Sequence, residues 1–249
     1  MTSDTPQRRV PWRSNITEVG PNSLRTHGMN QREIINTFSY EEMVFFLLKG
    51  RRPQSSEADL LLAVIVAHIS HGITGQSSLA VMEAADCRSG FLHAAIAGFS
   101  VGAGVFHQGG LAATMTELER YAGMDDEALI ADLNERIRRK ERVMGFGHRF
   151  HTRDPRAATL IQIAERHNSV GQHLKTALKI EQFLQERNGV AINIEAAGGG
   201  ILLDLGIPPI IAHLIILIGR SPMYAALYLE RLAQDRKPFQ KIEVLDVLE

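Results

Sequence analysis

One loop, residues 143–156, gathers the residue types that bind anions and move protons; its sequence is VMGFGHRFHTRDPR. Its Gly-x-Gly turn lets the backbone approach a ligand closely, and His148, a side chain that titrates near neutral pH, follows at once. Asp154 and Pro155 then predict a helix start that carries Arg156, with the aspartate as N-cap and the proline at the first helical position. These residue types favour a site for an anionic substrate, a phosphorylated one included. The alternative is a basic surface loop.

A pair of histidines forms a second stretch with chemical potential. His68 and His71 stand three residues apart, a spacing that places both rings on one face at a helix end. Substrate binding is the interpretation we favour, and the alternatives are a helix cap, a core position or a metal site. A zinc site needs at least three protein ligands, and no third ligand has suitable spacing here. We therefore predict no metal site.

Two further stretches place a proton-transfer group beside glycine. His107 is followed closely by Gly109 and Gly110, so its ring can point into a cleft while the next backbone approaches a ligand. This pattern also occurs in ordinary turns. Glu195 stands between apolar residues and the three glycines 198–200, surroundings that raise a carboxyl pKa and suit the group to proton transfer. The alternative for Glu195 is an acid at a helix N-terminus that faces water.

The sequence contains no nucleophile elbow, phosphate-cradling P-loop, dinucleotide fingerprint or Cys-x-x-Cys pair. The chemistry that remains is proton transfer by histidines and one carboxylate, with arginines to hold anions. The elements that must position these groups are helical, because caps, apolar residues at helical spacing and terminating Gly or Pro recur along the chain. Only residues 190–194 resemble a strand, so we predict an all-α fold. The expected helices lie within residues 39–50, 56–72, 89–104, 125–141, 155–167, 172–187 and 208–235.

Composition narrows the class of protein. A chain of 249 residues can bury a substantial core, and its formal net charge of −1 argues against a dedicated nucleic-acid binder. A single cysteine, Cys87, permits no internal disulfide and suits a reducing cytoplasm. The most apolar run, residues 207–219, is too short and too interrupted to span a bilayer, and the N-terminus lacks the apolar segment of a secretory signal. We expect a cytoplasmic protein that binds neither nucleic acid nor membrane.

The ordered set of motifs resembles the citrate synthase superfamily, in the short form of citryl-CoA lyases and of the C-terminal module of ATP-citrate lyase. Residues 145–156 are the most specific part, since they closely resemble Gly-Phe-Gly-His-Arg…Asp-Pro-Arg. The other matching stretches are Leu47–Pro53, His68–Ser78, Phe106–Gly110, Ile192–Pro208 and Gly219–Glu230. The resemblance implies a citrate-synthase-like helical fold that lacks the extra N-terminal helical region of full citrate synthases. Composition predicts a loose tail at residues 1–13, and the absence of a sequence repeat or obvious linker predicts one helical domain over residues 14–249. Within this domain the resemblance implies that residues 143–235 carry the CoA and catalytic motifs typical of the family's small domain.

The resemblance also implies a role for each matching residue. His107 would hydrogen-bond the thioester oxygen and stabilise the enolate of acetyl-CoA, whereas His148 would exchange a proton with the carbonyl or hydroxyl oxygen of oxaloacetate or citryl-CoA. Glu195, at the position of the family's aspartate, would exchange a proton with the methyl carbon of acetyl-CoA. The implied contacts of the substrate carboxylates are His71, Arg156 and Arg220. The implied backbone lining of the CoA adenine pocket is Met144, Gly145, Phe146 and Gly147.

Physical chemistry agrees with these roles. A donor aimed at a developing enolate supplies much of the rate, and the arginine fork suits a dicarboxylate. The clearest departure from the family is Glu195, because its extra methylene moves the carboxylate by about an ångström, which can cost about 100-fold in rate. The other departures are Gln108 within the His-Gly-Gly element, Ala112 in place of an acid, a segment from His148 to Arg156 that is one residue shorter than usual, and Met223 and Leu227 in the last helix.

The implied activity is that of an acyl-CoA carbon–carbon lyase or synthase. The interpretation we prefer is retro-Claisen cleavage of (3S)-citryl-CoA to acetyl-CoA and oxaloacetate. The alternatives are condensation as in citrate or 2-methylcitrate synthases, cleavage of another hydroxyacyl-CoA, and an inactive binding or regulatory subunit. The CoA thioester and an oxaloacetate-type dicarboxylate would be substrates, with no permanently bound cofactor. Small residues in 89–104 and the apolar residues 210–218 predict helix packing across a homodimer or a higher homo-oligomer.

Overall fold

The computed structural model describes residues 13–234. The chain divides into two compact units, Met1–Ala58 and Asp59–Glu249. The division falls inside α3 (Ser55–Ala67). The expected tail at residues 1–13 lies almost entirely outside the described residues, and the expected single domain over residues 14–249 stays a prediction.

The first unit begins with a small antiparallel sheet that the sequence analysis did not predict. Its strands, in the order β1-β2-β3, are β1 (Thr17–Gly20), β2 (Ser23–Thr26) and β3 (Met29–Asn30). In β1 and β2, Thr17 pairs with Thr26 and Gly20 pairs with Ser23. The strands are short and almost wholly exposed, so they lack the alternation of apolar and polar residues by which a half-buried strand is predicted.

Helices α1 (Gln31–Thr37) and α2 (Tyr40–Lys49) follow the sheet in the first unit. Helix α2 confirms the predicted start, because Ser39 and Glu42 form a reciprocal capping box. Its end is also as predicted, since Gly50 adopts the left-handed conformation with φ of 70°.

The second unit is predominantly helical, which confirms the predicted fold class. Its helices beyond α3 are α4 (Gln76–Asp86), α5 (Phe91–Gly102), α6 (Gly110–Ala122), α7 (Asp126–Arg138), α8 (Pro155–Arg166), α9 (Gln172–Asn188), α10 (Ile194–Asp204) and α11 (Ala212–Ala233), with the short 3-10 helices η1 (Gly72–Thr74) and η2 (Pro209–Ile211).

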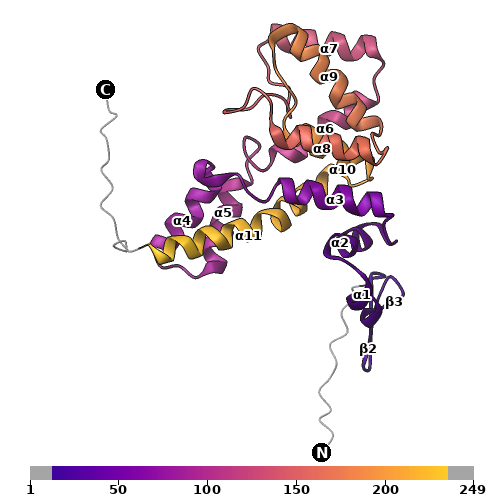
Figure 1. Ribbon diagram of the computed structural model, residues 1–249, viewed down its shortest axis with the longest axis vertical. Coiled ribbons are helices and arrows are strands. Elements are labelled where there is room, and N and C mark those ends of the chain that lie inside the picture. Colours follow the sequence, from indigo (N-terminus) through magenta and orange to yellow (C-terminus); the bar gives the residue numbers. More distant parts are fainter. Residues whose placement is uncertain (1–12, 235–249) are drawn as a thin grey trace, which may run out of the picture. The chain divides into compact units, whose positions relative to one another are not determined.

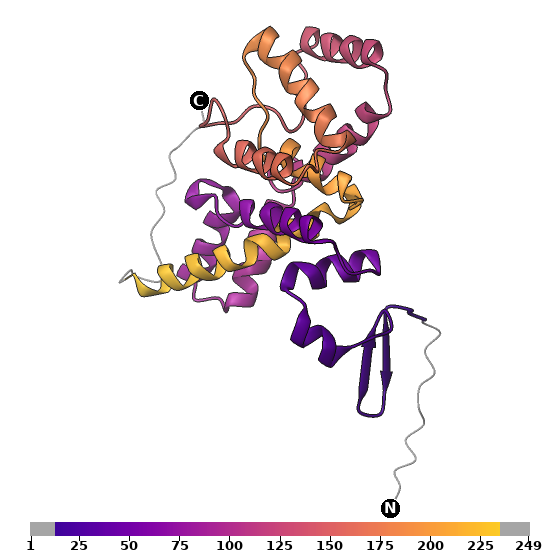
Figure 2. The same cartoon turned by 45° about the vertical axis from the view of Figure 1, so that its right-hand side comes forward.

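Helix α10 is buried along most of its length, and α6, α8 and α9 pack around it (Figure 2). Close packing depends on glycine at one position in particular. A Cβ atom at Gly200 would lie 2.9 Å from the backbone Cα of Leu174 in α9, so a side chain there would push two helix backbones apart. The first turn of α10, which carries Glu195, is therefore held in place by its neighbours.

Helices α4, α5 and α11 lie side by side (Figure 1). Val81, Ala94, Tyr224 and Leu227 form a buried cluster among them. The Tyr224 ring lies against Gly98 of α5, where a Cβ atom would approach the ring to 2.9 Å. The small-residue segment 89–104 thus packs against α4 and α11 of the same chain, whereas the predicted packing across a subunit boundary stays a prediction.

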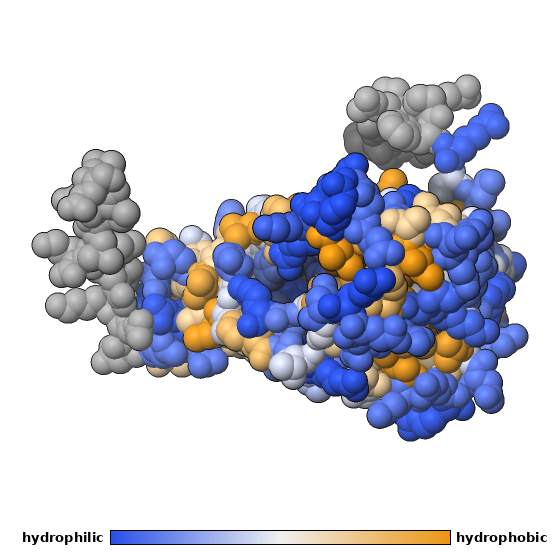
Figure 3. All heavy atoms as spheres, turned by 90° about the horizontal axis from the view of Figure 1, so that it is seen from above, coloured by the Kyte–Doolittle hydropathy of each residue, from blue (hydrophilic) through white to orange (hydrophobic). Residues whose placement is uncertain are grey.

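Among the described residues, one helical stretch, Pro209–Ala233, is long and apolar enough to cross a membrane by length and composition. It packs against α4, α5 and α6 and contains the buried side chains of Arg220 and Tyr224, so we interpret it as a core helix. On the face seen in Figure 3, hydrophilic residues (blue) dominate and apolar residues (orange) appear in separate groups.

Candidate active site

A pocket of about 470 Å³ in the second unit brings together side chains from segments far apart in the sequence. Helix starts and helix-flanking loops supply most of them, as expected for a site built on a rigid helical scaffold. All three predicted catalytic residues and all three predicted carboxylate contacts line this pocket: His71, His107, His148, Arg156, Glu195 and Arg220.

The Gly-x-Gly turn is fixed by hydrogen bonds to the segment that precedes α10. The backbone N–H of Asn193 donates to the carbonyl of Gly145 at 3.0 Å, and its side-chain amide donates to the carbonyl of Gly147 at 2.9 Å. The strand expected at residues 190–194 is reduced to a single β-bridge between Phe146 and Ile192. Sequence reasoning missed Asn193, which ties the loop of His148 to the helix of Glu195.

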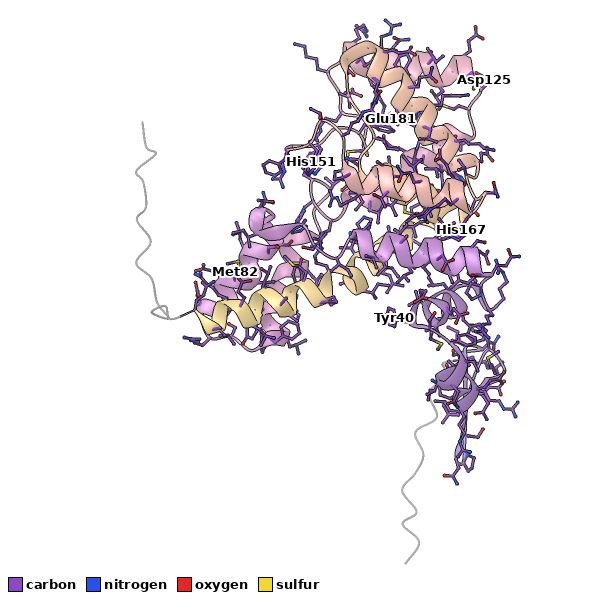
Figure 4. The ribbon with its side chains drawn as sticks, viewed as in Figure 1. Tyr40, Met82, Asp125, His151, His167 and Glu181 are labelled. Atoms are coloured by element: carbon purple, nitrogen blue, oxygen red, sulfur yellow. The ribbon has the colours of Figure 1, made fainter. Side chains whose placement is uncertain are left out.

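His148 is held in one tautomer by its own loop. Its Nδ1 atom accepts hydrogen bonds from the backbone N–H groups of Phe150 and His151 at 3.1 and 3.2 Å. A neutral ring therefore carries its proton on Nε2, and Nη2 of Arg156 lies 3.4 Å from that atom. Burial lowers the pKa of His148, which favours the neutral form. His151, labelled in Figure 4, stacks on the same ring with centroids 4.5 Å apart.

Asp154 is a functional residue that the sequence analysis recognised only as a helix cap. The cap is confirmed, since its carboxylate accepts the N–H of Arg156 at 3.0 Å. The same buried carboxylate accepts from Nε and Nη2 of Arg156 at 2.9 and 2.8 Å and from the N–H of Ile194 at 3.1 Å. Burial alone would raise the pKa of Asp154, but the hydrogen bonds and charge of Arg156 lower it overall. Asp154 thus orients the guanidinium and joins the starts of α8 and α10.

His68 and His71 both present an unprotonated nitrogen to the pocket. Their Nδ1 atoms lie 2.8 and 2.9 Å from the carbonyl oxygens of Val64 and Gly72, and a carbonyl can only accept. Burial lowers the pKa of each histidine to about 4, so both rings are neutral at pH 7. Both Nε2 atoms are buried without a hydrogen-bond partner among the described residues. In this tautomer Nε2 of His71 can accept a hydrogen bond and cannot donate one, and its contact with a carboxylate stays a prediction.

His107 lies beside His71, with ring centroids 5.5 Å apart. Gly75 makes this possible, since a Cβ atom there would lie 2.7 Å from the ring of His71 and 3.3 Å from that of His107. The hydroxyl of Ser77, which sequence reasoning missed, lies 2.8 Å from Nε2 of His107. When this hydroxyl donates to Nε2, the ring proton sits on Nδ1. Burial lowers the pKa of His107, so the neutral ring is favoured.

Gln108, the extra residue of the His-Gly-Gly element, anchors the loop of His107. Its buried side chain donates to the hydroxyl of Tyr224 at 2.5 Å. It also covers Gly102 of α5, where a Cβ atom would approach the amide to 2.4 Å. Only the unusual spacing of the motif could have indicated this anchoring role from the sequence.

Glu195 lies in the first turn of α10, where the side chain of Asn193 caps the helix by accepting its N–H at 2.8 Å. Burial raises the pKa of Glu195 to about 7, while the charges of Arg142 and Arg156 act in the opposite direction. The predicted raised pKa agrees with this direction. At neutral pH the carboxyl group is divided between its acid and its carboxylate forms.

Arg220 supplies a buried positive charge from α11. Burial lowers its pKa to about 10, so the guanidinium remains protonated at pH 7. Its Nε and Nη1 atoms are buried and have no hydrogen-bond partner among the described residues. Within residues 13–234 no group of three or more His, Cys, Asp or Glu side chains could hold a metal ion. The free donors of Arg220 suit an anionic ligand instead.

The four residues predicted to line the CoA adenine pocket fall into two pairs. Phe146 and Gly147 line a second pocket of about 350 Å³, and Gly147 also lines the main one. Met144 and Gly145 line neither pocket. The N–H of Met144 donates to Glu117 at 3.3 Å, and Gly145, with φ of 85°, packs against Thr114 and Ala196. Met144 and Gly145 therefore fix the turn through contacts with α6 and α10, away from both pockets.

The family model for the citrate synthase C-terminal domain matches residues 51–243, a range that includes every residue of this site. The chain belongs to the citrate synthase C-terminal domain family. A curated member, a citrate synthase of Acidithiobacillus ferridurans, is 27% identical over 212 residues, which are 80% of this chain and 53% of that protein. The chain spans about half the length of the curated relatives it matches.

Solved structures with the citrate synthase fold superpose on the chain. The citryl-CoA lyase of Hydrogenobacter thermophilus gives a TM-score of 0.84 at 23% identity, covering 94% of this chain and 92% of that one. The ATP citrate lyase of Methanothrix soehngenii, determined with citrate and coenzyme A, gives 0.80 at 16% identity, covering 96% and 43%. These likenesses confirm the predicted citrate-synthase-like fold.

Proposed function

We propose that the chain cleaves citryl-CoA to acetyl-CoA and oxaloacetate by a retro-Claisen reaction. The observation that carries this proposal is one pocket that holds two neutral imidazoles together with Glu195, a carboxyl group still partly protonated at neutral pH. Cleavage releases the enolate of acetyl-CoA, which must be protonated on carbon. A carboxyl group with a pKa near 7 is a suitable general acid at that pH.

The steps assign one proton movement to each group. In the tautomer with its proton on Nδ1, His148 accepts the proton of the tertiary hydroxyl at Nε2. At the same time the carbon–carbon bond breaks and its electron pair passes to the α-carbon of the thioester. His107 donates from Nδ1 to the thioester oxygen and stabilises the enolate as it forms. Glu195 then delivers a proton to the carbon and gives acetyl-CoA. His148 returns its proton to solvent and Glu195 takes one up, so the cycle is balanced.

Charged groups of the pocket hold the dicarboxylate end of the substrate. The free Nε and Nη1 donors of Arg220 face one carboxylate, and Arg156, oriented by Asp154, faces another. The coenzyme A portion extends toward the second pocket, where Phe146 and Gly147 lie. On this proposal coenzyme A enters as part of the substrate and the protein needs no permanently bound cofactor.

The likeness to citryl-CoA lyase supports cleavage, because that enzyme superposes on 94% of this chain with a TM-score of 0.84. We further propose a cytoplasmic homodimer or larger homo-oligomer. Exposed apolar side chains on helices of the second unit, such as Leu92 and Ile96 of α5 and Leu229 of α11, support association between copies.

Condensation is a second proposed function, and one observation favours it. In the tautomer fixed by the backbone N–H groups of Phe150 and His151, His148 offers a donor at Nε2. A donor suits the carbonyl oxygen of oxaloacetate, the substrate of condensation. Cleavage requires the other tautomer, in which Nδ1 is protonated and releases these two hydrogen bonds.

Two samples separate the candidate functions, one with citryl-CoA and one with acetyl-CoA and oxaloacetate. The protein is incubated with citryl-CoA, and oxaloacetate is followed through malate dehydrogenase by loss of NADH while free CoA thiol is measured in parallel. A lyase gives oxaloacetate without free thiol. A synthase releases free thiol from acetyl-CoA and oxaloacetate. Absence of both reactions, together with absence of CoA binding, contradicts both proposals and indicates a binding or regulatory subunit.

A further inference from the structure

The carboxyl group of Glu195 rests on the backbone of Gly110, the first residue of α6. A Cβ atom at Gly110 would lie 2.5 Å from Oε1 and 2.9 Å from both Cδ and Oε2 of Glu195. The three atoms nearest to that position therefore all belong to one carboxyl group. The contact joins α6 to α10, and its two residues are 85 positions apart in the sequence.

The backbone conformation of Gly110 does not itself require glycine. Gly110 begins α6 in a helical conformation and is not among the residues with positive φ. Its neighbour Gly109 differs, because a Cβ atom there would lie 2.6 and 2.9 Å from the backbone oxygens of Ala103 and Gly104. Gly109 is thus needed for the path of the chain, whereas a side chain at Gly110 meets the movable end of a glutamate.

The contact with Gly110 matters because the side chain of Glu195 is longer than an aspartate. Its resemblance to the family's aspartate position implies a carboxyl group that reaches one methylene further than usual. The space above Gly110 accommodates that added length. Three other charged groups act on the same carboxyl group through their charge, namely Arg142, Arg156 and Asp154.

We propose that Gly110 is a positioning residue for proton transfer, because its missing side chain provides the seat on which the Glu195 carboxyl group is held. This inference rests on the proposed function for its effect on turnover. A methyl group at this position displaces the carboxyl group and leaves the helices where they are, since the end of a glutamate side chain rotates more easily than a packed backbone moves.

The first test is Gly110→Ala, compared with Gly104→Ala as a matched control. Gly104 lies in the same segment, and a Cβ atom there meets nothing within 4 Å. In citryl-CoA cleavage we expect kcat of Gly110→Ala to fall about 100-fold with KM nearly unchanged. The melting temperature should not fall, because alanine is the better helix former. A folded Gly110→Ala protein with wild-type kcat would overturn the proposal.

The second test repeats Gly110→Ala in the background of Glu195→Asp. The shorter carboxyl group no longer occupies the seat, so the added methyl should cost at most about threefold in kcat, far less than in the wild type. Equal losses in the two backgrounds would show that Gly110 acts independently of Glu195 and would overturn the proposal.

A spectroscopic test separates failure of the seat from failure of the proposed function. The Glu195 carboxyl carbon is titrated by carbon-13 NMR in the wild type, Gly110→Ala and Gly104→Ala, with Glu195→Gln to assign the signal. We expect only Gly110→Ala to move the pKa, from about 7 toward the ordinary value of 4.5, because the carboxyl leaves its buried seat. An unchanged pKa of Glu195 would overturn the proposal that Gly110 positions its carboxyl group. The NMR titration tests the role of Gly110 even if Glu195→Asp or the wild type does not cleave citryl-CoA. A wild type that does not cleave citryl-CoA contradicts only the proposed function.

Discussion

A single buried carboxylate, Asp154, organises much of the charge in the pocket. It holds the guanidinium of Arg156 with two hydrogen bonds and accepts the N–H of Ile194, one residue before Glu195. Arg156, the proposed contact of a substrate carboxylate, and the first turn of α10, which carries the proposed acid Glu195, are therefore anchored to the same group. Removing its charge should affect stability and substrate binding together.

We predict that Asp154→Asn lowers the free energy of unfolding by about 3 kcal/mol, because the shape is kept while Arg156 loses its buried counter-charge. Urea unfolding followed by circular dichroism measures this loss. The variant should also raise KM for the dicarboxylate, since the guanidinium is no longer held in one orientation. A matched control is Asp126→Asn, an exposed carboxylate paired with Lys179, which should cost less than about 1 kcal/mol. Equal losses for the two variants would contradict the role of Asp154.

Glu195 predicts a dependence of stability on pH. Its pKa is raised from 4.5 to about 7 in the folded protein, so the folded state binds a proton that the unfolded state releases between these values. Stability from this group is present below pH 4.5 and is lost as the pH rises through 7. Glu195→Gln cannot titrate. Relative to this variant the wild type should lose about 2 kcal/mol between pH 5 and pH 8 in urea unfolding, and parallel curves would contradict the raised pKa.

At the scale of elements, the glycines of α10 allow neighbouring helices to pack close to its backbone. Gly200→Ala would bring a methyl group to 2.9 Å from the Cα of Leu174. We expect a loss of about 2 kcal/mol in unfolding free energy, because two backbones must separate. Gly199→Ala is the matched control, since its methyl group meets Cγ of Met115, a flexible side chain, at 3.0 Å. If the control lost as much as Gly200→Ala, backbone contact would not be the reason.

The elements differ in how far their sequences predict them. Local signals suffice where the stabilising contact is local, as for the capping box of Ser39 and the Asp154 cap of α8. The histidines that the family resemblance singled out, His71, His107 and His148, line one pocket, and their catalytic and binding roles stay predictions. Contacts made across the fold leave no local trace. Ser77 beside His107 and the tautomer of His148 depend on atoms that only the tertiary structure brings together.

At the scale of the whole molecule, the exposed apolar side chains of α5 give the clearest expectation. Leu92 and Ile96 are 68% and 53% exposed and stand four residues apart on one helix face. We predict that the wild type sediments as a dimer or larger oligomer at micromolar concentration and that Leu92→Glu with Ile96→Glu shifts it toward monomer. Ile130→Glu, a change at an isolated exposed position on α7, is the control. A wild-type monomer would contradict the proposed association.

The position of Arg220 late in the sequence has a consequence for folding during synthesis. It is contributed by α11, whereas the histidines it faces come from residues 71 and 107, more than a hundred positions earlier. Such distant partners meet only after long loops have closed, which makes them late events in folding. A ribosome-bound nascent chain that has not yet released α11 would lack this cation. The affinity for dicarboxylates that we propose should therefore appear only after α11 has left the ribosome.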